Sequence, residues 1–288
     1  MKTNLYILGA AGISQNEPDY KDFIQDAGLR RRMSRVIRMS VASSIMAMRE
    51  AAVDKFDAIV TGTGWGCLAD TEKFLVSIIQ NDERLLNPSS FIQSTSNTVG
   101  AQIALMLGDN HYNNTFVHGS SSFESALIDA ALLVLEGKNL VLAGGFDELT
   151  STKRHLLGRM GMWREHKGGE GAAFFVLASE PVSKQRGVIK SVEILSLNES
   201  YDEICNKVEK LVNGNTLFMC GDGSIASILN DRGLRSENYK EITGEFPTAS
   251  ALALFLATER LAEDNEIEKI VLVNKFIKDS STVIELVR

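Results

Sequence analysis

Two kinds of hydrophobic pattern alternate along the chain. Short apolar runs that end at glycine or polar residues predict strands, because strands in a layered fold are brief and mostly buried. The predicted strands cover residues 5–10, 58–62, 114–118, 139–143, 172–178, 188–197, 216–220, 269–273 and 282–287. Longer segments with apolar residues at helical spacing predict helices over residues 32–53, 71–80, 97–107, 124–136, 201–212, 224–229 and 249–262. Residues 87–97 are rich in Ser and Thr and contain Pro88, which predicts a loop.

This alternation of strands and helices predicts an α/β fold built on a mainly parallel sheet. The order of elements in the second half repeats that of the first, which indicates a duplicated unit of strands and helices. The polar stretch at residues 184–187 is the best boundary between them. The predicted halves are therefore residues 1–184 and 185–288.

Composition and charge narrow the class of function. The 288 residues are 44% hydrophobic and 23% charged, as in globular proteins. The net charge of −7 argues against nucleic acid as the main partner, because phosphate binding needs clustered cations. No apolar run approaches the ~20 residues of a membrane helix, so we expect no membrane association. The cysteines at positions 67, 205 and 220 form no CxxC pair, so we expect no metal site and a cytoplasmic location.

Five motifs, in this order, resemble the β-ketoacyl synthase branch of the thiolase superfamily. They are the helix at residues 31–48, the turn TGTGWG, the turn GSSSF with the helix and AGGFDE strand behind it, the strand GGEGA, and the segment KEITGEF. The resemblance implies a thiolase-like fold of five layers, αβαβα, built from two pseudo-symmetric halves. It also implies a dimer that pairs through the strand at residues 114–118.

The resemblance also assigns positions to the family's catalytic groups. Ser120 stands where the family has its nucleophilic cysteine, while Asp222 and Glu245 stand where it has two histidines. Lys240 is retained, but residues 275–280 contain no glycine where the family has a Gly-rich turn of the oxyanion hole. A neutral serine needs an adjacent base to attack, and an ionised carboxylate repels an enolate. Together these changes predict a chain that no longer condenses acyl units.

Non-condensing members of this family include the chain-length factors, which pair with an active synthase and shape its acyl tunnel. The resemblance therefore implies a bacterial subunit of this type, similar to those of aryl polyene and flexirubin pathways. Its expected partners are an active ketosynthase, or a second copy of itself, and an acyl carrier protein. We expect no cofactor on the chain itself, because the carrier protein presents the acyl chain on its own phosphopantetheine.

Three residues near the Ser120 turn are candidates for the acyl tunnel or the dimer interface. They are Phe116, His118 and Phe123. In the family a small residue stands at the position of Phe123, so its ring would either limit the depth of the tunnel or fill space that a bound chain has vacated.

The arginines near the start of the predicted helix at residues 32–53 are candidates for carrier-protein docking. Arg31, Arg35 and Arg38 follow helical spacing, so we expect them on one face. Arginine suits the acidic helix and phosphopantetheine arm of a carrier protein. The alternative is a solvated start of the helix.

Ser120 leaves open an enzyme of another class, an acyltransferase or thioesterase. A serine at a sharp strand-to-helix turn is typical of hydrolase nucleophiles. This reaction needs a histidine within about 3 Å of the hydroxyl. The candidates are His118, His155 and His166. Asp222 and Glu245 are then either an acid–base pair or remnants, and a further alternative is a protein of this fold without an acyl role.

Overall fold

The structure, a computed structural model, describes residues 1–164, 166–276 and 279–288. The strands of the first half are β1 (Lys2–Ile13), β2 (Ala58–Gly62), β3 (Tyr112–Phe116), β4 (Leu140–Asp147) and β5 (Gly171–Ala178). Its helices are α1 (Ala27–Arg32), α2 (Arg35–Ala51), α3 (Leu68–Gln80), α4 (Pro88–Gln93), α5 (Thr98–Leu107), α6 (Ser122–Leu135) and α7 (Ser151–Arg159), with short turns η1 (Tyr20–Asp22), η2 (Gly119–Ser121) and η3 (Met162–Arg164).

The second half is smaller. Its strands are β6 (Gly187–Ile194), β7 (Thr216–Cys220), β8 (Ser236–Asn238), β9 (Lys269–Lys275) and β10 (Ser281–Val287). Its helices are α8 (Tyr201–Glu209), α9 (Gly223–Asp231), α10 (Lys240–Thr243) and α11 (Ala249–Glu263).

The strands form one sheet in which the two halves repeat the same order. The order is β3-β2-β4-β5-β1-β6-β10-β9-β7-β8, so β3-β2-β4-β5-β1 corresponds to β8-β7-β9-β10-β6. β2 runs parallel to β3 and β4, and β7 runs parallel to β8 and β9. The remaining pairings are antiparallel. The predicted mainly parallel sheet is therefore wrong; β9 and β10, for example, are too close in sequence for the crossover that parallel pairing requires.

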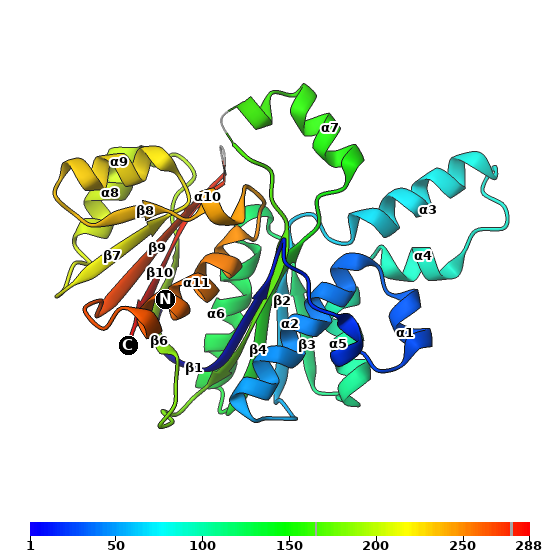
Figure 1. Ribbon diagram of the computed structural model, residues 1–288, viewed down its shortest axis with the longest axis horizontal. Helices are drawn as coiled ribbons and strands as arrows, with labels where there is room; N and C mark the ends of the chain where they lie inside the picture. The colour runs from blue at the N-terminus through cyan, green and yellow to red at the C-terminus, as the bar shows by residue number, and fades with distance from the viewer. Residues whose placement is uncertain (165, 277–278) are drawn as a thin grey trace.

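The two halves of this sheet lie on opposite sides of α6 and α11, so strands and helices together stack in five layers (Figure 1). Because β4 and β5 are buried along almost their whole length, both of their faces must be covered. α6 and α11 share one hydrophobic cluster with strands of both halves. α2 and α5 cover the outer face of the first half, and α8 and α9 cover that of the second. This arrangement confirms the five-layer fold that the resemblance implies.

The helix predicted over residues 32–53 corresponds to α2, which starts three residues later, at Arg35. α1 ends at Arg32, and the extended backbone of Met33 and Ser34 separates it from α2. Asp26 caps α1 independently, since its carboxylate accepts the N–H groups of Gly28 and Leu29. No residue of α1 is buried, so α1 shows no hydrophobic period from which a separate helix could be predicted.

Residues 87–97 also differ from the predicted loop, because α4 begins at Pro88. Asn87 Oδ1 accepts the N–H of Ser89 at 2.9 Å, and proline occupies the first turn. Both are features of a helix start.

α3, α4 and α7 project from the layered body (Figure 1). Large apolar side chains are exposed on these projections, among them Leu75, Ile79, Phe91, Ile92, Leu156 and Met160. Exposed apolar groups gathered in this way are typical of contact surfaces between proteins. None of the helices in the described ranges has the length and apolar character needed to cross a bilayer.

Glu124 lies fully buried on α6, and this gives the first prediction. Its Oε1 accepts the hydroxyl of Thr282 at 2.7 Å. Burial raises the pKa of Glu124 above its usual 4.5, although hydrogen bonds oppose the shift. Because the pKa in the folded state exceeds that in the unfolded state, this contribution to stability is full below pH ~4.5 and is lost as the pH rises.

Glu124→Gln keeps the acceptor oxygen but cannot ionise. We expect the variant to match the wild type near pH 5 and to exceed its unfolding free energy by about 1–3 kcal/mol at pH 8. Urea unfolding at both pH values measures the difference. A variant that is destabilised equally at both would contradict the raised pKa.

Candidate functional site

Ser120 lies in the tight turn that joins β3 to α6. Gly119 opens the turn with a φ of +59°, a left-handed conformation that favours glycine. The Ser122 hydroxyl accepts the N–H of His118 at 2.9 Å and lies 2.9 Å from the carbonyl oxygen of Thr63. Ser120 itself is fully buried. The position that the resemblance gives to the nucleophile is therefore closed to solvent in this chain.

The carboxylate of Asp279 covers the backbone N–H of Ser120. That N–H donates to Asp279 Oδ2 at 3.2 Å, and the N–H of Ser280 donates to Oδ1 at 2.9 Å. Burial raises the pKa of Asp279, but hydrogen bonds from Ser120 and Ser280 outweigh it and hold the pKa below its usual value. An anion thus already occupies the amide that an oxyanion hole would offer to a reacting carbonyl.

The sequence did not reveal this contact. Residues 275–280 stood out only for the absence of glycine, and residues 277 and 278 lie outside the described part of the chain. A Cβ on Gly119 would come 3.0 Å from Asp279 Oδ2, which shows how closely the carboxylate approaches the turn.

Asn274 on β9 joins the Ser120 turn to the second half. Its Nδ2 donates to the carbonyl oxygen of Ser120 at 3.4 Å, and its Oδ1 accepts the hydroxyl of Tyr239 at 2.7 Å. Both Asn274 and Tyr239 are buried. The turn is therefore fixed from both sides by polar side chains that the sequence patterns did not single out.

Lys240 and Glu245 form a buried ion pair next to this network. Lys240 Nζ lies 2.7 Å from Glu245 Oε1 and also donates to the carbonyl oxygen of Lys275. Burial lowers the pKa of Lys240 and raises that of Glu245, while their mutual attraction partly offsets both shifts. His166 Nδ1 lies 3.6 Å from the other oxygen of Glu245. The pair leaves neither group free to act on an acyl substrate.

A cavity of about 190 Å³ opens beside this pair. Its lining includes His166, Asn238, Lys240 and Glu245, but neither Ser120 nor Asp222. Asp222 instead caps α9, where its carboxylate accepts the N–H of Ser224 at 2.8 Å. Its charge still contributes to the raised pKa of Glu245. The structure therefore brings Lys240 and Glu245 together but does not gather Ser120, Asp222 and Glu245 in this cavity.

The three candidate histidines lie away from the Ser120 hydroxyl, and two of them contact other side chains. His118 Nδ1 lies 3.0 Å from the hydroxyl of Ser125, one turn along α6. His155 is exposed on α7, and His166 faces Glu245. Among the described residues none of the three forms a hydrogen bond or ion pair with Ser120, so the geometry offers no histidine base to a serine nucleophile. The described residues also contain no group of three His, Cys, Asp or Glu side chains that could hold a metal ion.

The aromatic candidates divide between the core and the edge of the sheet. Phe123 is fully buried and packs against Phe175 with a ring-centroid distance of 5.7 Å. Phe116 ends the edge strand β3, and its ring meets that of His118 at 5.7 Å. Phe116 is half-buried and His118 is exposed, so both remain available to a partner at this edge, whereas Phe123 fills the core.

The expectation that Arg31, Arg35 and Arg38 share one helical face is wrong. Arg31 belongs to α1, while Arg35 and Arg38 belong to α2. Arg35 forms ion pairs with Glu17 and Glu170, and the guanidinium of Arg38 lies 5.6 Å from the ring centroid of Tyr20. Two of the three are thus held by contacts within the chain, and the docking role of the set stays a prediction.

Asp147 is a structural centre of the site that sequence reasoning missed. It is fully buried, and its Oδ1 accepts the N–H groups of Gly64 and Trp65. Its Oδ2 accepts both the N–H and the hydroxyl of Thr248. The acidic end of the AGGFDE motif thereby holds the TGTGWG turn against the start of α11.

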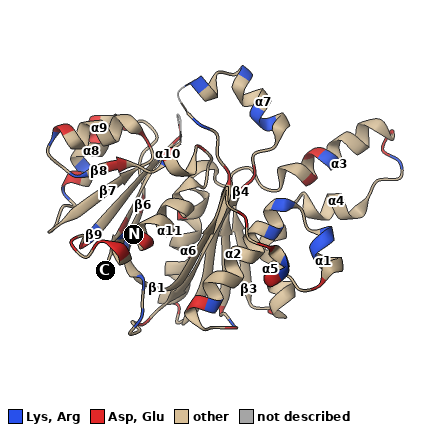
Figure 2. Ribbon diagram, viewed as in Figure 1, with Lys and Arg blue, Asp and Glu red and all other residues tan. Residues whose placement is uncertain are grey.

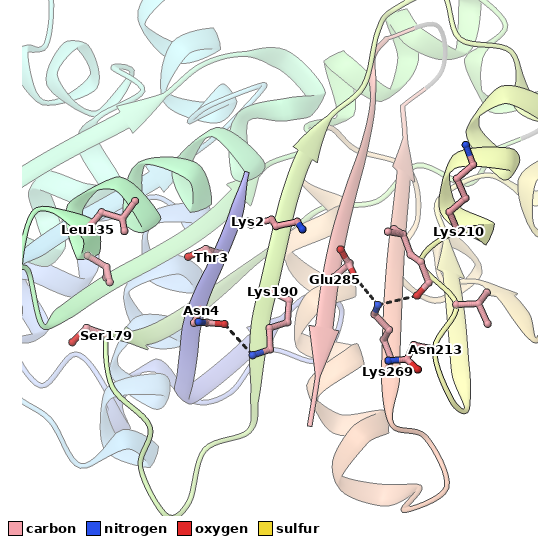
Figure 3. A pocket seen from close by; sticks show the side chains of 13 residues that line it. Lys2, Thr3, Asn4, Leu135, Ser179, Lys190, Lys210, Asn213, Lys269 and Glu285 are labelled. Carbon is pink, nitrogen blue, oxygen red and sulfur yellow. Dashed lines mark hydrogen bonds and ion pairs between the residues drawn. The ribbon is translucent and has the colours of Figure 1, made fainter.

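A larger cavity, of about 830 Å³, lies on another part of the sheet (Figure 3). Lys2, Lys190, Lys210 and Lys269 line it. Lys269 pairs with Glu285 and donates to the carbonyl oxygen of Leu211 just beyond α8, as expected of a cation near a helix C-terminus. None of the residues predicted for the site lines this cavity.

Comparison with known proteins agrees with the motifs. Residues 13–153 match the model of the family described as beta-ketoacyl synthase, N-terminal domain. Comparison with curated protein sequences finds no match.

Several solved structures share the fold over nearly the whole chain. A chain of the type II PKS complex AntDE:AntF, an acyl-carrier protein with its ketosynthase bound to the hexaketide, has a TM-score of 0.82 and 15% identity over 99% of both chains. A beta-ketoacyl synthase from Burkholderia phymatum STM815 has a TM-score of 0.78 and 14% identity over 100% of both chains.

A chain of the complex of the ketosynthase ApeO with its chain length factor ApeC, from Xenorhabdus doucetiae, has a TM-score of 0.77. The identity is 13%, over 99% of this chain and 98% of that one. Likeness at this level of identity concerns the fold, and the family match concerns the first half. The chain thus has the thiolase-like fold of the ketosynthases, and its residues 13–153 resemble the N-terminal domain of the β-ketoacyl synthases.

Proposed function

We propose that this chain is a non-condensing, chain-length-factor-like subunit that pairs with an active β-ketoacyl synthase. The heterodimer would extend acyl chains on a carrier protein in bacterial polyene or polyketide synthesis, in the cytoplasm. This chain would shape the acyl tunnel at the interface, and the partner would supply the nucleophile.

The observation that supports this proposal most strongly is the hydrogen bond from the backbone N–H of Ser120 to the carboxylate of Asp279. In a condensing enzyme that amide must be free to stabilise an oxyanion. Here the position of the nucleophile is a buried serine, and the position of one catalytic histidine is a carboxylate already paired with Lys240. Two complexes of similar fold each contain a ketosynthase with its chain length factor, and this likeness supports a paired role.

The outer edge of β3 is the expected place where the partner subunit pairs with this chain. Among the described strands β3 has only β2 as a neighbour, so its outer edge carries backbone groups that no other described strand pairs with. Val117, which follows the strand, and Leu105 on α5 are 52% and 73% exposed. An unpaired edge flanked by apolar side chains suits a second sheet that continues across the interface.

Co-expression with the ketosynthase from the same gene neighbourhood tests the proposal. We expect a one-to-one complex by native mass spectrometry, and we expect Leu105→Asp together with Val117→Asp to abolish it. Leu197→Asp is the matched control, because Leu197 is 57% exposed but belongs to the second half. A chain that remains alone, or that pairs equally well with either change, would contradict the proposal.

A further inference from the structure

The cavity of about 830 Å³ is lined by residues of both halves and lies away from the Ser120 turn. β1 and the end of α6 line it from the first half, while β6, β9, β10 and the segment after α8 line it from the second. α6 begins beside the Ser120 turn, and its last residue, Leu135, lines the cavity. The 14 residues of this helix span about 20 Å. A ligand in the cavity would therefore not share the space of an acyl substrate at Ser120.

The lining of this cavity has a charge opposite to that of the whole chain. Acidic and basic residues are both distributed over the two halves, and the chain has a net charge of −7 (Figure 2). The cavity, in contrast, is lined by one glutamate, Glu285, and four lysines, a net charge of +3. The lysines are Lys2, Lys190, Lys210 and Lys269. A concave surface with one sign of charge focuses the electric field and attracts small anions.

Glu285 neutralises only one of these lysines. Its Oε2 lies 2.5 Å from Lys269 Nζ, and its Oε1 accepts the hydroxyl of Ser191. Burial raises the pKa of Glu285, but the hydrogen bonds from Lys269 and Ser191 outweigh it and hold the pKa below its usual value. Lys269 also donates to the carbonyl oxygen of Leu211, and so it covers the negative end of α8 that would otherwise repel an anion.

The other three lysines have no carboxylate partner. Within the described part of the chain, Lys2, Lys190 and Lys210 form no ion pair. Lys190 Nζ donates to the neutral side chain of Asn4 at 2.9 Å (Figure 3). Lys2 and Lys190 stand on the adjacent strands β1 and β6, and Lys210 follows α8. Like charges around one cavity repel each other, and a bound anion would remove that repulsion.

Apolar side chains border the lysines. Leu135 and Val212 line the same cavity and are 74% and 41% exposed. Pockets for small molecules commonly combine an apolar wall with a few polar groups, and this cavity has a volume in their usual range. It therefore offers one set of contacts to a charged group and another to an apolar group.

We propose that this cavity binds a small molecule with a diphosphate group, either free pyrophosphate or the diphosphate of a nucleotide. A diphosphate has a charge of roughly −3 at pH 7, because its terminal phosphate contributes almost −2. This charge matches the three lysines that have no carboxylate partner. The ligand would bridge the two halves, since Lys2 belongs to the first and Lys190 and Lys210 belong to the second. The site is independent of the proposed function, and either can fail without the other.

Isothermal titration calorimetry of the full chain with pyrophosphate tests the site. The cavity variant removes the three unpaired cations by Lys2→Gln, Lys190→Gln and Lys210→Gln. The control variant changes three exposed lysines that do not line the cavity, by Lys21→Gln, Lys55→Gln and Lys73→Gln. We expect saturable binding to the wild type. At low salt the cavity variant should raise the Kd at least ~10-fold and the control variant less than ~2-fold.

Leu135→Glu is a second variant that keeps every lysine. It places a carboxylate on the exposed wall of the cavity, so we expect a Kd at least ~3-fold higher than that of the wild type. Pyrophosphate should also raise the Tm of the wild type, because a ligand that binds only the folded chain stabilises it. The same addition should leave the Tm of the cavity variant unchanged.

ADP and adenosine identify the source of the diphosphate. ADP that binds at least as tightly as pyrophosphate assigns the site to a nucleotide, and weaker binding of ADP assigns it to free pyrophosphate. Several results would overturn the site: no saturable binding of pyrophosphate or ADP below about 5 mM, equal losses in the cavity and control variants, or orthophosphate binding as tight as that of pyrophosphate. Adenosine that binds as tightly as ADP would do the same, because the phosphates would then contribute nothing.

Discussion

Replacing Ser120 by cysteine alone is expected to leave the new thiol nearly unreactive toward iodoacetamide. A thiol at a helix N-terminus normally gains acidity from the helix dipole. Here the Asp279 carboxylate on the Ser120 amide opposes the thiolate, and full burial disfavours it further. Adding Asp279→Gly removes the anion and opens the amide, so the double variant should be labelled at least ~10 times faster.

Two controls separate the causes. Asp279→Asn with Ser120→Cys keeps the size of the side chain but removes its charge, and we expect an intermediate rate. The wild type measures labelling of the three native cysteines, all of which are buried. Fast labelling of the Ser120→Cys variant without any change at Asp279 would show that the carboxylate does not close the site.

The largest effect on stability is expected for Lys240→Met. The change leaves the buried carboxylate of Glu245 without its cation and removes the donor to the carbonyl oxygen of Lys275. Loss of one partner of a buried pair typically costs about 3–5 kcal/mol. Urea unfolding measures the loss, and we expect it near the lower end because His166 still faces Glu245.

Lys240→Met combined with Glu245→Gln is the matched comparison. Because this double variant leaves no buried charge unpaired, its unfolding free energy should fall by only about 1–2 kcal/mol. A double variant that is as unstable as Lys240→Met would mean that the lysine stabilises the fold through its other contacts, such as the carbonyl oxygen of Lys275, and not through its pairing with Glu245.

Hydrophobic patterning predicted most strands and helices because both repeat with a fixed period. It could not show α1 as a separate helix, since no residue of α1 is buried. It could not show strand direction either, because direction depends on the connections. The resemblance supplied what periodicity lacks, namely the five layers and the position of Ser120.

The contacts that define the site could not be predicted from the sequence. Asp279 and Ser120 are far apart along the chain and meet only because β9, β10 and α6 share one layered body. Asp147 looked like the polar end of a strand, yet it holds the turn at Gly64 and Trp65. Arg35 looked free because its partners, Glu17 and Glu170, come from distant segments.

Intact mass of both chains of the heterodimer, after incubation with an acylated carrier protein, tests the central claim most directly. We predict an acyl adduct on the partner ketosynthase and an unchanged mass for this chain. An adduct on this chain that disappears in the Ser120→Ala variant would contradict the claim, because it would show that the closed serine still performs acyl transfer.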